Sequence, residues 1–501
     1  MTLFKLRQKY KPVLPQILSQ PGTVVFEKSG HLPVQAEIKK LFPKTSDQSL
    51  LLGKKRSAQK VSPLKIGAVF SGGQAPGGHN ILTGLFDALH SKSKLFGFLD
   101  GPSGVISGKY IELTASTLDP YRNQGGFDLL GSGRTKIETD QQLQSTLKTA
   151  NDLDLDGLVI IGGDDSNTNA AFIAEYFLQH GCKTKVIGVP KTIDGDLQNQ
   201  HVEISFGFDT ATKIYSELIG NIAKDALSAK KYYHFIKLMG RSASHITLEC
   251  ALKTHPNLTL ISEECHTLTE ITLKIADLIE QREEIGKHYG VILIPEGLIE
   301  HMPEMSGLIK ELKKSNFSLE SKAIWEMLPE RVQQQLLLDR DPHGNVNLSA
   351  VETEVVLIEA VTKELKKRKF KGKFSPLAHF FGYEGRAGLP SNFDANYCYA
   401  LGHTAALLID QGFTAYMAFV EHLSKPASEW SIGGLPLASQ LILCQKKPVI
   451  VKAYVDLKGT PYHRLKKHAD KWALEDDYQC PGPTQFFGES ALTDSVPFII
   501  Q

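Results

Sequence analysis

The sequence predicts an α/β protein made of two doubly wound, mostly parallel-sheet domains of the Rossmann type, with a helical insertion. Three observations predict this fold class. Short apolar runs recur along the chain, each ends in a glycine-rich polar cluster, and a helical pattern follows each cluster. Apolar runs without polar alternation indicate strands buried on both faces, as in parallel sheets covered by helices. Alternation of strands with helices favours the doubly wound architecture.

The predicted strands lie between residues 64 and 294. They cover residues 64–70, 158–161, 186–189, 235–238 and 291–294. In doubly wound sheets, ligands bind in the crevice at the carboxyl ends of the strands. We therefore expect the polar clusters that follow these runs to converge on one crevice.

The regions outside these strands divide the chain further. Its 501 residues indicate two or three structural units. Residues 1–60 are predicted to be an irregular N-terminal arm with a helical pattern near 34–41, and residues 302–375 a helical insertion. The basic run at 363–373 is more typical of a solvated helix face than of an anion site. Strand patterns return near 378–381 and 449–455, and residues 456–501 form a C-terminal extension that is irregular from 476.

The two predicted domains are assembled from separate segments. The first covers residues 61–230 and is completed by segments from 378–455. The second covers residues 231–301 and part of 376–440.

The composition excludes several classes of function. A net charge of +1 gives no argument for nucleic acid or a membrane surface as partner. No apolar run is long enough to span a bilayer, and the first residues lack the apolar core of a signal peptide. The 6 cysteines are scattered without a C-x-x-C pair, which argues against zinc and disulfides. A reducing cytoplasm is the simplest location.

The first polar cluster, SGGQAPGGHN at residues 71–80, follows a strand and opens a helix. Its glycines, including Gly72 and Gly73, let the backbone approach an anion, and N–H groups at a helix start can cradle phosphate oxygens. Glycine-rich turns also follow strands without any such role. The cluster is not a Walker A motif, because no Gly-Lys-Ser/Thr closes it.

The second cluster, GGDDSNTNA, places Asp164 and Asp165 where a strand ends and a helix begins. Such a carboxylate can hold Mg²⁺ while the ion bridges phosphate oxygens. The structural alternative is simple capping of the helix N-terminus.

The third cluster, PKTIDGD, brings Lys191, Asp194 and Asp196 onto one loop. Phosphoryl transfer to a hydroxyl needs a base near that hydroxyl and cations around the moving group. Asp194 suits the base and Lys191 the cation. The alternative is an Asx-type turn with Gly195 at positive φ.

Three further clusters, MGRSASH, PEG and GYEGR, follow later strands. Arginine suits bidentate phosphate binding, and Glu296 can accept hydrogen bonds from sugar hydroxyls. Each residue alone is more often a cap or a surface residue. Their value lies in their occurrence together.

These six motifs, in this order, resemble the phosphofructokinase family over about residues 64–435. The sequence is most similar to the long pyrophosphate-dependent members, which include the catalytic β-type chain of plants, and residues 225–252 are especially close to that group. The resemblance implies reversible phosphoryl transfer from pyrophosphate to O1 of fructose 6-phosphate, with Mg²⁺ as cofactor, in glycolysis or gluconeogenesis. It also implies a homodimer or higher homo-oligomer.

The resemblance also assigns roles to individual residues. The implied catalytic residues are Asp194, the proton acceptor, with Lys191, Asp165 and Arg241. Pyrophosphate contacts are implied for Gly72, Gly73, Arg134 and Lys136, and metal contacts for Asp164 and Asp196. Sugar-phosphate contacts are implied for Thr192, Ile193, Asp194, Met239, Gly240, Arg241, Glu296, Tyr383, Glu384, Gly385 and Arg386, with Lys231 and Tyr232 reaching the site of a neighbouring subunit.

Two positions carry the donor prediction. ATP-using members of the family have glycine where this chain has Asp165 and glycine where it has Lys191. A carboxylate at 165 narrows the groove and repels a further phosphate. A lysine at 191 adds positive charge where the transferred group develops charge. Both substitutions favour pyrophosphate.

Three alternatives stay open. An ATP-dependent phosphofructokinase is disfavoured by Asp165 and Lys191. A non-catalytic regulatory chain is expected to have lost catalytic residues that are present here. A dinucleotide-binding protein is disfavoured because the first turn lacks G-x-G-x-x-G. The loop GYEGR departs from the GYQAR of plant relatives at Glu384 and Gly385.

Overall fold

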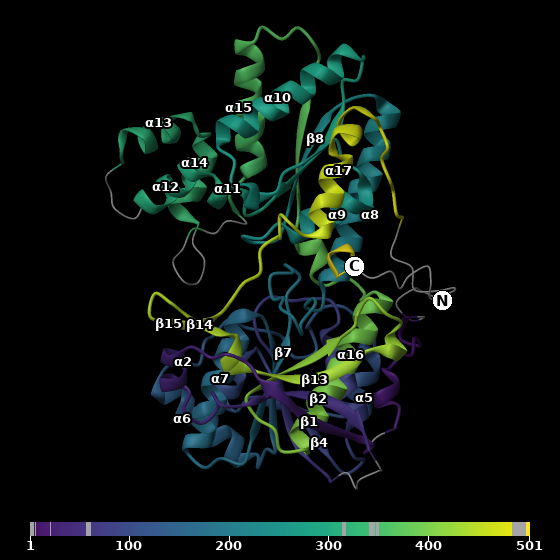
Figure 1. The fold of residues 1–501 in the computed structure, drawn as a ribbon, viewed down its shortest axis with the longest axis vertical. Coiled ribbons are helices and arrows are strands. Elements are labelled where there is room, and N and C mark those ends of the chain that lie inside the picture. Colours follow the sequence, from purple (N-terminus) through teal and green to yellow (C-terminus); the bar gives the residue numbers. More distant parts are fainter. Residues whose placement is uncertain are drawn as a thin grey trace.

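The chain folds into two α/β bodies, each built on its own sheet, in a computed structural model (Figure 1). The structure describes residues 5, 7–20, 22–56, 62–312, 317–339, 346, 350–482 and 497–500. Parts of the predicted N-terminal arm, helical insertion and C-terminal extension lie outside these residues. The predicted fold class is confirmed, because the centre of the first sheet and all of the second are parallel, and helices cover both sheets.

The first body contains a nine-stranded sheet in the order β1-β2-β13-β12-β7-β6-β3-β4-β5. Strands β12, β7, β6, β3 and β4 are parallel to one another, and antiparallel strands extend this centre at both edges. The strands are β1 (Val24–His31), β2 (Ser49–Lys55), β3 (Lys65–Phe70), β4 (Lys94–Phe98), β5 (Tyr110–Leu113), β6 (Gly157–Gly162), β7 (Lys185–Pro190), β12 (Tyr416–Glu421) and β13 (Ser431–Pro436).

Strands β1 and β2 correct the expectation of an irregular N-terminal arm. They pair with each other, and β2 also pairs with β13 inside the sheet. The strand signal in β1 is weak, because only its first residues alternate between buried and less buried positions and all five residues from Glu27 to His31 are exposed. An edge strand of this kind lacks the apolar run of a central parallel strand. The predicted helical pattern near 34–41 corresponds to α2 (Ala36–Leu41).

The second body contains a four-stranded parallel sheet in the order β11-β8-β10-β9. Its strands are β8 (Tyr233–Leu238), β9 (Leu258–Thr259), β10 (Gly290–Pro295) and β11 (Pro376–Phe381). Side chains of β8 alternate between two cores. Ile236 and Leu238 face one cluster, whereas Tyr233 and Phe235 face the other. Both faces of the sheet are therefore buried, as the continuous apolar runs predict.

Helices cover both faces of each sheet. In the first body, α3 and α16 pack on one face, and α2, α4, α6 and α7 on the other. In the second body, α8, α9 and α17 cover one face, and α10 and α15 the other. The bounds are α3 (Gly78–Ala88), α4 (Pro102–Ser107), α5 (Ala115–Leu118), α6 (Asp140–Asp152), α7 (Asp164–Gln179), α8 (Phe208–Ala229), α9 (His245–Thr254), α10 (Leu268–Glu284), α15 (Thr353–Lys367), α16 (Asn392–Asp410) and α17 (Thr460–Leu474).

The described part of the predicted insertion, residues 302–375, is mainly helical. After α11 (Leu298–His301), which precedes it, the insertion contains α12 (Pro303–Glu311), α13 (Leu319–Met327), α14 (Glu330–Leu338) and α15, and residues 368–375 belong to no helix. Helices α12 to α14 form a lobe beside the second body (Figure 1). None of the described helices is long and apolar enough to cross a membrane.

The predicted strand near 449–455 needs correction. The strand β15 (Lys447–Ile450) pairs with β14 (Leu441–Cys444) in a hairpin, and residues 451–456 belong to no strand. After the hairpin, the chain rises from the first body to α17 of the second (Figure 1). The alternating sequence pattern continues past β15. The chain leaves the hairpin here and bonds to Asp196 and Glu263, so residues 451–456 have no neighbouring strand to pair with.

Candidate active site

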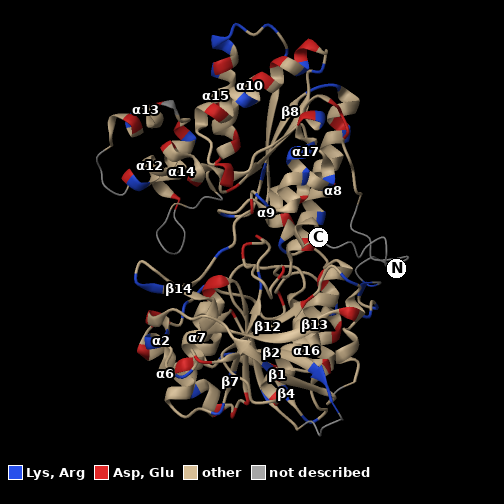
Figure 2. Ribbon diagram, viewed as in Figure 1, with Lys and Arg blue, Asp and Glu red and all other residues tan. Residues whose placement is uncertain are grey.

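The candidate site lies between the two bodies, where the carboxyl ends of β3, β6 and β7 face those of β8, β10 and β11. Charged residues of both signs lie in this junction (Figure 2). Each strand leads directly into one of the polar clusters that the sequence singles out. Parallel strands bring their carboxyl ends to one edge, so the topology gathers three clusters on each body. The packing of the two bodies then brings the two sets together, as the approach of Arg241 to Asp164 and Asp194 shows.

The glycine-rich turn after β3 holds a group of cations. Gly72 has φ of 88°, and a Cβ built there would lie 3.2 Å from the Lys191 ammonium. A Cβ on Gly73 would lie 3.6 Å from Cζ of Arg386 and 3.7 Å from Nη2 of Arg134. Lys191 Nζ also donates to the Gly73 carbonyl at 2.7 Å. A backbone without side chains, ringed by cations, suits the close approach of a phosphate group.

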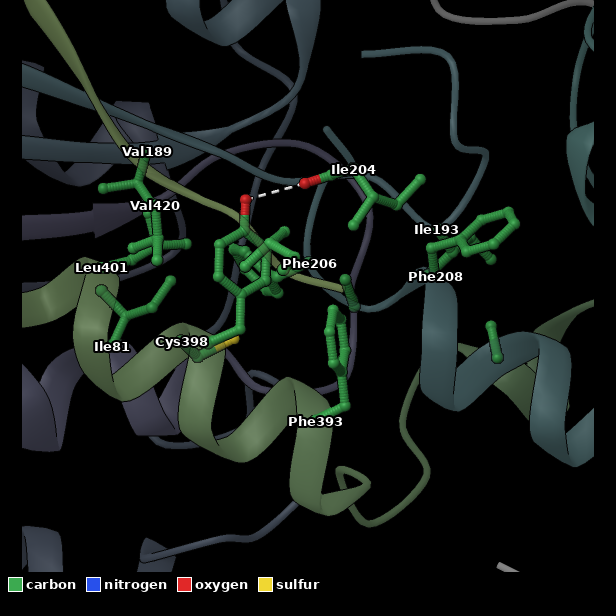
Figure 3. Packing of buried hydrophobic residues seen from close by; sticks show 14 of the residues in the cluster. Ile81, Val189, Ile193, Ile204, Phe206, Phe208, Phe393, Cys398, Leu401 and Val420 are labelled. Carbon is green, nitrogen blue, oxygen red and sulfur yellow. Dashed lines mark hydrogen bonds between the residues drawn. The ribbon is translucent and has the colours of Figure 1, made fainter. Parts of the chain in front are cut away.

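The loop after β7 is fixed by buried apolar contacts. Ile193 is 4% exposed and lies near Phe208 and Phe206 in the core, which also receives Phe393 and Leu401 of α16 (Figure 3). Gly195 has φ of 75°, as the sharp turn between the two carboxylates requires. The Asp194 N–H donates to Thr192 Oγ1 at 3.1 Å. This apolar anchor holds the two flanking carboxylates at the junction.

Three carboxylates and one guanidinium meet in the centre of the site. Asp194 Oδ2 lies 3.4 Å from Arg241 Nε, and Asp164 Oδ1 lies 3.9 Å from Arg241 Nη1. Asp194 and Asp196 are 6% and 4% exposed, so both carboxylates are nearly out of water. Arg241 reaches across from the second body, with a backbone φ of 48°.

The environment shifts the pKa values of these groups. Burial, and then the charge of Asp194, raise the pKa of Asp196 to about 7. Burial, and then the Arg241 charge, lower the pKa of the Lys191 ammonium to about 8. Burial opposes ionisation of Asp164 as well, but Lys452 and Arg241 outweigh it and hold its pKa below the usual value. The Asp194 charge, despite burial, raises the pKa of Arg241. Such clustered, perturbed groups are typical of functional sites.

Asp165 lies apart from this centre. It is exposed at the start of α7, and its Oδ1 is 3.1 Å from Lys136 Nζ. The predicted donor residues Lys136 and Asp165 thus form an ion pair at the outer edge of the site. Arg134 lies on the loop that also carries Lys136. The hydrogen bond from Gly72 N to the Gly133 carbonyl, at 2.9 Å, holds this loop beside β3.

The second body contributes a wall that is already hydrogen-bonded. Glu296 is 1% exposed, and its Oε2 accepts from the N–H groups of Gly240 and Arg241 at 2.8 and 2.9 Å. This carboxylate joins the ends of β8 and β10. Met239 is buried, and its N–H donates to the Phe381 carbonyl at 2.9 Å, which ties β8 to β11.

The loop after β11 carries the remaining predicted residues. Tyr383 is 64% exposed, and Cζ of Arg386 lies 4.9 Å from the centroid of its ring. Glu384 Oε2 accepts from Gly382 N at 2.7 Å. A Cβ at Gly385 would lie 2.4 Å from the Tyr215 hydroxyl, so this position has no room for a side chain. The unusual residues Glu384 and Gly385 therefore shape the loop that presents Tyr383 and Arg386.

Lys231 and Tyr232 are not brought into this site. Both are exposed and precede β8, whereas Met239, Gly240 and Arg241 follow it. A strand rises about 3.3 Å per residue, so the two groups are separated by roughly 20 Å along the sheet.

Sequence reasoning missed Lys452. Its ammonium lies 3.6 Å from Asp164 Oδ2 and 3.8 Å from Asp196 Oδ2. The alternating stretch around it predicted a strand, and no glycine-rich turn marks it as a site residue. Only the path of the chain after β15 places it here.

The described residues include no group of three or more His, Cys, Asp or Glu side chains arranged to hold a metal ion by themselves. Asp164 and Asp196 nevertheless fit Mg²⁺, which keeps several waters and is usually bound through one or two carboxylates together with substrate phosphates. The ion pairs of Lys452 and Arg241 with these carboxylates show that cationic charge is favoured at this point.

The fold and the site define a two-body α/β protein whose strand ends bring cations and carboxylates together at one junction. The chain belongs to the phosphofructokinase family: the family model described as Phosphofructokinase matches residues 65–409.

Curated relatives and solved structures agree with this assignment. A pyrophosphate–fructose 6-phosphate 1-phosphotransferase subunit beta 2 from Arabidopsis thaliana is 50% identical, over 95% of this chain and 89% of its own length. The pyrophosphate–fructose 6-phosphate 1-phosphotransferase of Porphyromonas gingivalis is 47% identical, over 98% of this chain and 96% of its own. The crystal structure of a pyrophosphate-dependent phosphofructokinase from Nitrosospira multiformis shares the fold, with a TM-score of 0.58 at 17% identity, covering 83% of this chain and 93% of that one.

Proposed function

We propose that this protein catalyses the reversible transfer of a phosphoryl group from pyrophosphate to O1 of fructose 6-phosphate. The observation that carries the proposal is the cluster of Asp164, Asp194 and Asp196 facing Lys191 and Arg241 at the junction of the two bodies. The relatives at 50% and 47% identity are named for this activity and match nearly the whole chain.

In the proposed reaction, O1 of the sugar attacks the near phosphorus of pyrophosphate in line. The O1–P bond forms as the P–O bond to the bridging oxygen breaks, and inorganic phosphate leaves. Asp194 accepts the O1 proton, because its carboxylate is buried on a rigid loop and faces the second body through Arg241. Phosphoryl transfer depends mainly on positioning and electrostatic stabilisation, and both require such fixed charges.

Cations from both bodies hold the phosphate groups in this proposal. Lys191 is anchored on the Gly73 carbonyl and supplies positive charge beside Gly72, where the donor phosphates lie. Arg386 and Arg134 approach the same turn. Arg241 stabilises the developing charge between Asp194 and the transferred group. Asp164 and Asp196 would hold Mg²⁺, which when bound neutralises part of the charge on the phosphate oxygens.

The sugar binds against the second body. Fructose 6-phosphate contacts are proposed for Met239, Gly240, Glu296, Tyr383 and Arg386, on the loops that end β8, β10 and β11. Lys231 and Tyr232 are proposed to reach the site of a second subunit. Their distance from the strand ends of their own chain, together with their exposure, supports this role and a homodimer or higher assembly.

The choice of pyrophosphate over ATP rests on Asp165 and Lys191. The Asp165 carboxylate lies beside Lys136 at the outer edge of the donor pocket, where a further phosphate and a nucleoside would extend. Its charge disfavours that longer donor. A non-catalytic regulatory role is disfavoured because Asp164, Asp194, Arg241 and Lys191 are all present in the site.

The proposal is tested by measuring fructose 1,6-bisphosphate formed from fructose 6-phosphate and Mg²⁺ by the purified full chain. Pyrophosphate and ATP are compared as donors at equal concentration. Turnover with pyrophosphate alone is the expected result. Turnover with ATP alone would contradict the donor assignment, and absence of turnover with both would favour the regulatory alternative.

A further inference from the structure

Lys452 is a cation that reaches the catalytic centre from outside the region matched by the family model, which ends at residue 409. Its ammonium lies between Asp164 at the end of β6 and Asp196 on the loop after β7. The Lys452 side chain is 30% exposed, so it is not sealed from solvent. Its position on the donor side is therefore set by two predicted metal carboxylates.

The backbone next to Lys452 is fixed to the catalytic loop. Ala453 N donates to the Asp196 carbonyl at 2.7 Å, and the Ala453 carbonyl is 3.1 Å from His245 Nε2 at the start of α9. Burial lowers the pKa of His245, so the ring is a neutral donor to this carbonyl. The ammonium is thus presented from a backbone that touches both bodies.

The ends of the segment are anchored on opposite bodies. Ile450 N donates to Thr168 Oγ1 of α7 at 3.2 Å, which fixes the segment to the first body. Val455 N donates to Glu263 Oε1 at 2.9 Å, which fixes it to the second. A backbone anchored at both ends in this way adds no ordering cost of its own when the side chain binds a ligand.

The Lys452 ammonium lies near two carboxylates without donating a hydrogen bond to either. Its distances of 3.6 and 3.8 Å to the two carboxylates exceed the usual 2.7–3.2 Å of an N–H···O hydrogen bond. Within the described part of the chain, no side-chain hydrogen bond from Lys452 occurs. Such a cation, held near carboxylates without direct bonds, is suited to an anion that enters beside them.

We propose that Lys452 is a further donor-binding residue, whose ammonium binds a phosphate oxygen of pyrophosphate and of the phosphate that leaves. This inference rests on the proposed function. It adds to the site a cation delivered by the C-terminal part of the chain. Because it lies on the donor side of Asp194, its effect concerns pyrophosphate and phosphate rather than the sugar.

The test compares Lys452→Gln with Lys452→Arg and with the control Lys447→Gln. Lys447 is exposed on β15 of the same hairpin, so its replacement changes the net charge equally without touching the site. For Lys452→Gln we expect KM for pyrophosphate, and KM for phosphate in reverse, to rise about 10–100-fold, the loss of one charge-assisted hydrogen bond. KM for fructose 6-phosphate should change less than twofold. Lys452→Arg should recover part of the loss, and the control should match wild type.

A binding measurement separates this inference from the proposed function. Methylene diphosphonate, a pyrophosphate analogue that cannot transfer phosphate, is titrated calorimetrically with Mg²⁺ into each variant, after thermal melts establish that all are folded. Weaker binding by Lys452→Gln alone supports the inference even if wild type shows no turnover, in which case only the proposed function fails. Equal analogue binding by all variants, or a rise confined to KM for the sugar, overturns the role of Lys452.

Discussion

The two bodies treat the carboxylates at their strand ends in opposite ways. On the first body, Asp164 and Asp196 face cations at 3.6 to 3.9 Å, too far for direct hydrogen bonds. On the second body, Glu296 accepts two backbone N–H groups at 2.8 and 2.9 Å. The carboxylates of the first body therefore remain able to bind a ligand directly. On the second body, the Glu296 carboxylate is already hydrogen-bonded and fixes the position of the loop at Gly240 and Arg241.

This difference has an energetic consequence. Burying a charge is costly, and the cost appears in the raised pKa of Asp196 and the lowered pKa of Lys191. A bound phosphate and its cation supply opposite charges to these groups. The relief of their burial cost then adds to the binding free energy of the ligand. Glu296 of the second body has no such cost to relieve, and its role is to position the loop that it binds.

The largest expected effect comes from removing Asp194, the proposed proton acceptor on the first body. Asp194→Ser should lower turnover by about 10²–10⁴-fold, the usual contribution of a general base, while KM for fructose 6-phosphate stays within a few-fold. Steady-state kinetics with pyrophosphate measure both constants. Asp154→Ser is the matched control, because Asp154 is exposed and precedes β6, away from the strand end that carries Asp164. Unchanged turnover of Asp194→Ser would remove Asp194 from the role of base.

A smaller effect is expected from removing the Glu296 carboxylate that ties together the strand ends of the second body. Glu296→Ala leaves the buried N–H groups of Gly240 and Arg241 without their acceptor, which displaces the sugar loop. KM for fructose 6-phosphate should rise about 10–100-fold, and KM for pyrophosphate much less. Glu296→Gln keeps an acceptor oxygen and should recover most of the loss. If both variants raise the two KM values equally, the division of labour between the bodies is wrong.

The same contrast explains which parts of the molecule were predictable from sequence. Central parallel strands are buried on both faces, so their apolar runs predict β3, β6, β7, β8 and β10 within a residue or two. The edge strand β1 carries only a weak alternation, and β2 beside it only a short buried run at 49–51, so the expectation of an irregular arm there was wrong.

The candidate site shows the same limit. Within each body, the clusters at the strand ends lie together because parallel topology requires it. Lys452 could not be found in this way, because its place depends on long-range bonds from Ala453 to Asp196 and from Val455 to Glu263. No local pattern encodes such contacts.

A still smaller effect tests the donor edge of the first body. Asp165→Gly removes one negative charge and frees Lys136 from its ion pair at 3.1 Å. We expect kcat/KM with ATP to rise about tenfold, the size of one like-charge repulsion near the surface. Glu138→Gly is the control, because Glu138 is also exposed near Lys136, at 3.9 Å, but lies outside the strand-end cluster. If ATP turnover is unchanged and pyrophosphate turnover is unaffected, Asp165 does not govern the donor.

The smallest expected effect is on the pH dependence of folding stability, and it comes from a buried histidine of the second body. His234 of β8 is buried, and its Nδ1 lies 2.9 Å from His379 Nε2 of β11. Burial, and then the neighbouring His379, lower the pKa of His234 to about 4 against a slight opposing pull from Asp225 of α8. Between pH 4 and the ordinary histidine value of 6.5, the unfolded chain thus binds more protons than the folded one. Stability conferred by the neutral ring is complete above pH 6.5 and declines as the pH falls through this window.

His234→Phe keeps the ring volume and removes the titrating nitrogens, so its Tm should fall less than that of wild type between pH 7.5 and pH 5. The exposed His463 of α17 provides the control His463→Phe, which should follow wild type. Buried carboxylates such as Asp196, with a raised pKa, act with the opposite sign, because they favour the folded state at lower pH. A wild-type Tm that is flat from pH 7.5 to 5, with no difference in His234→Phe, would mean that the histidine pair of the second sheet is not held neutral.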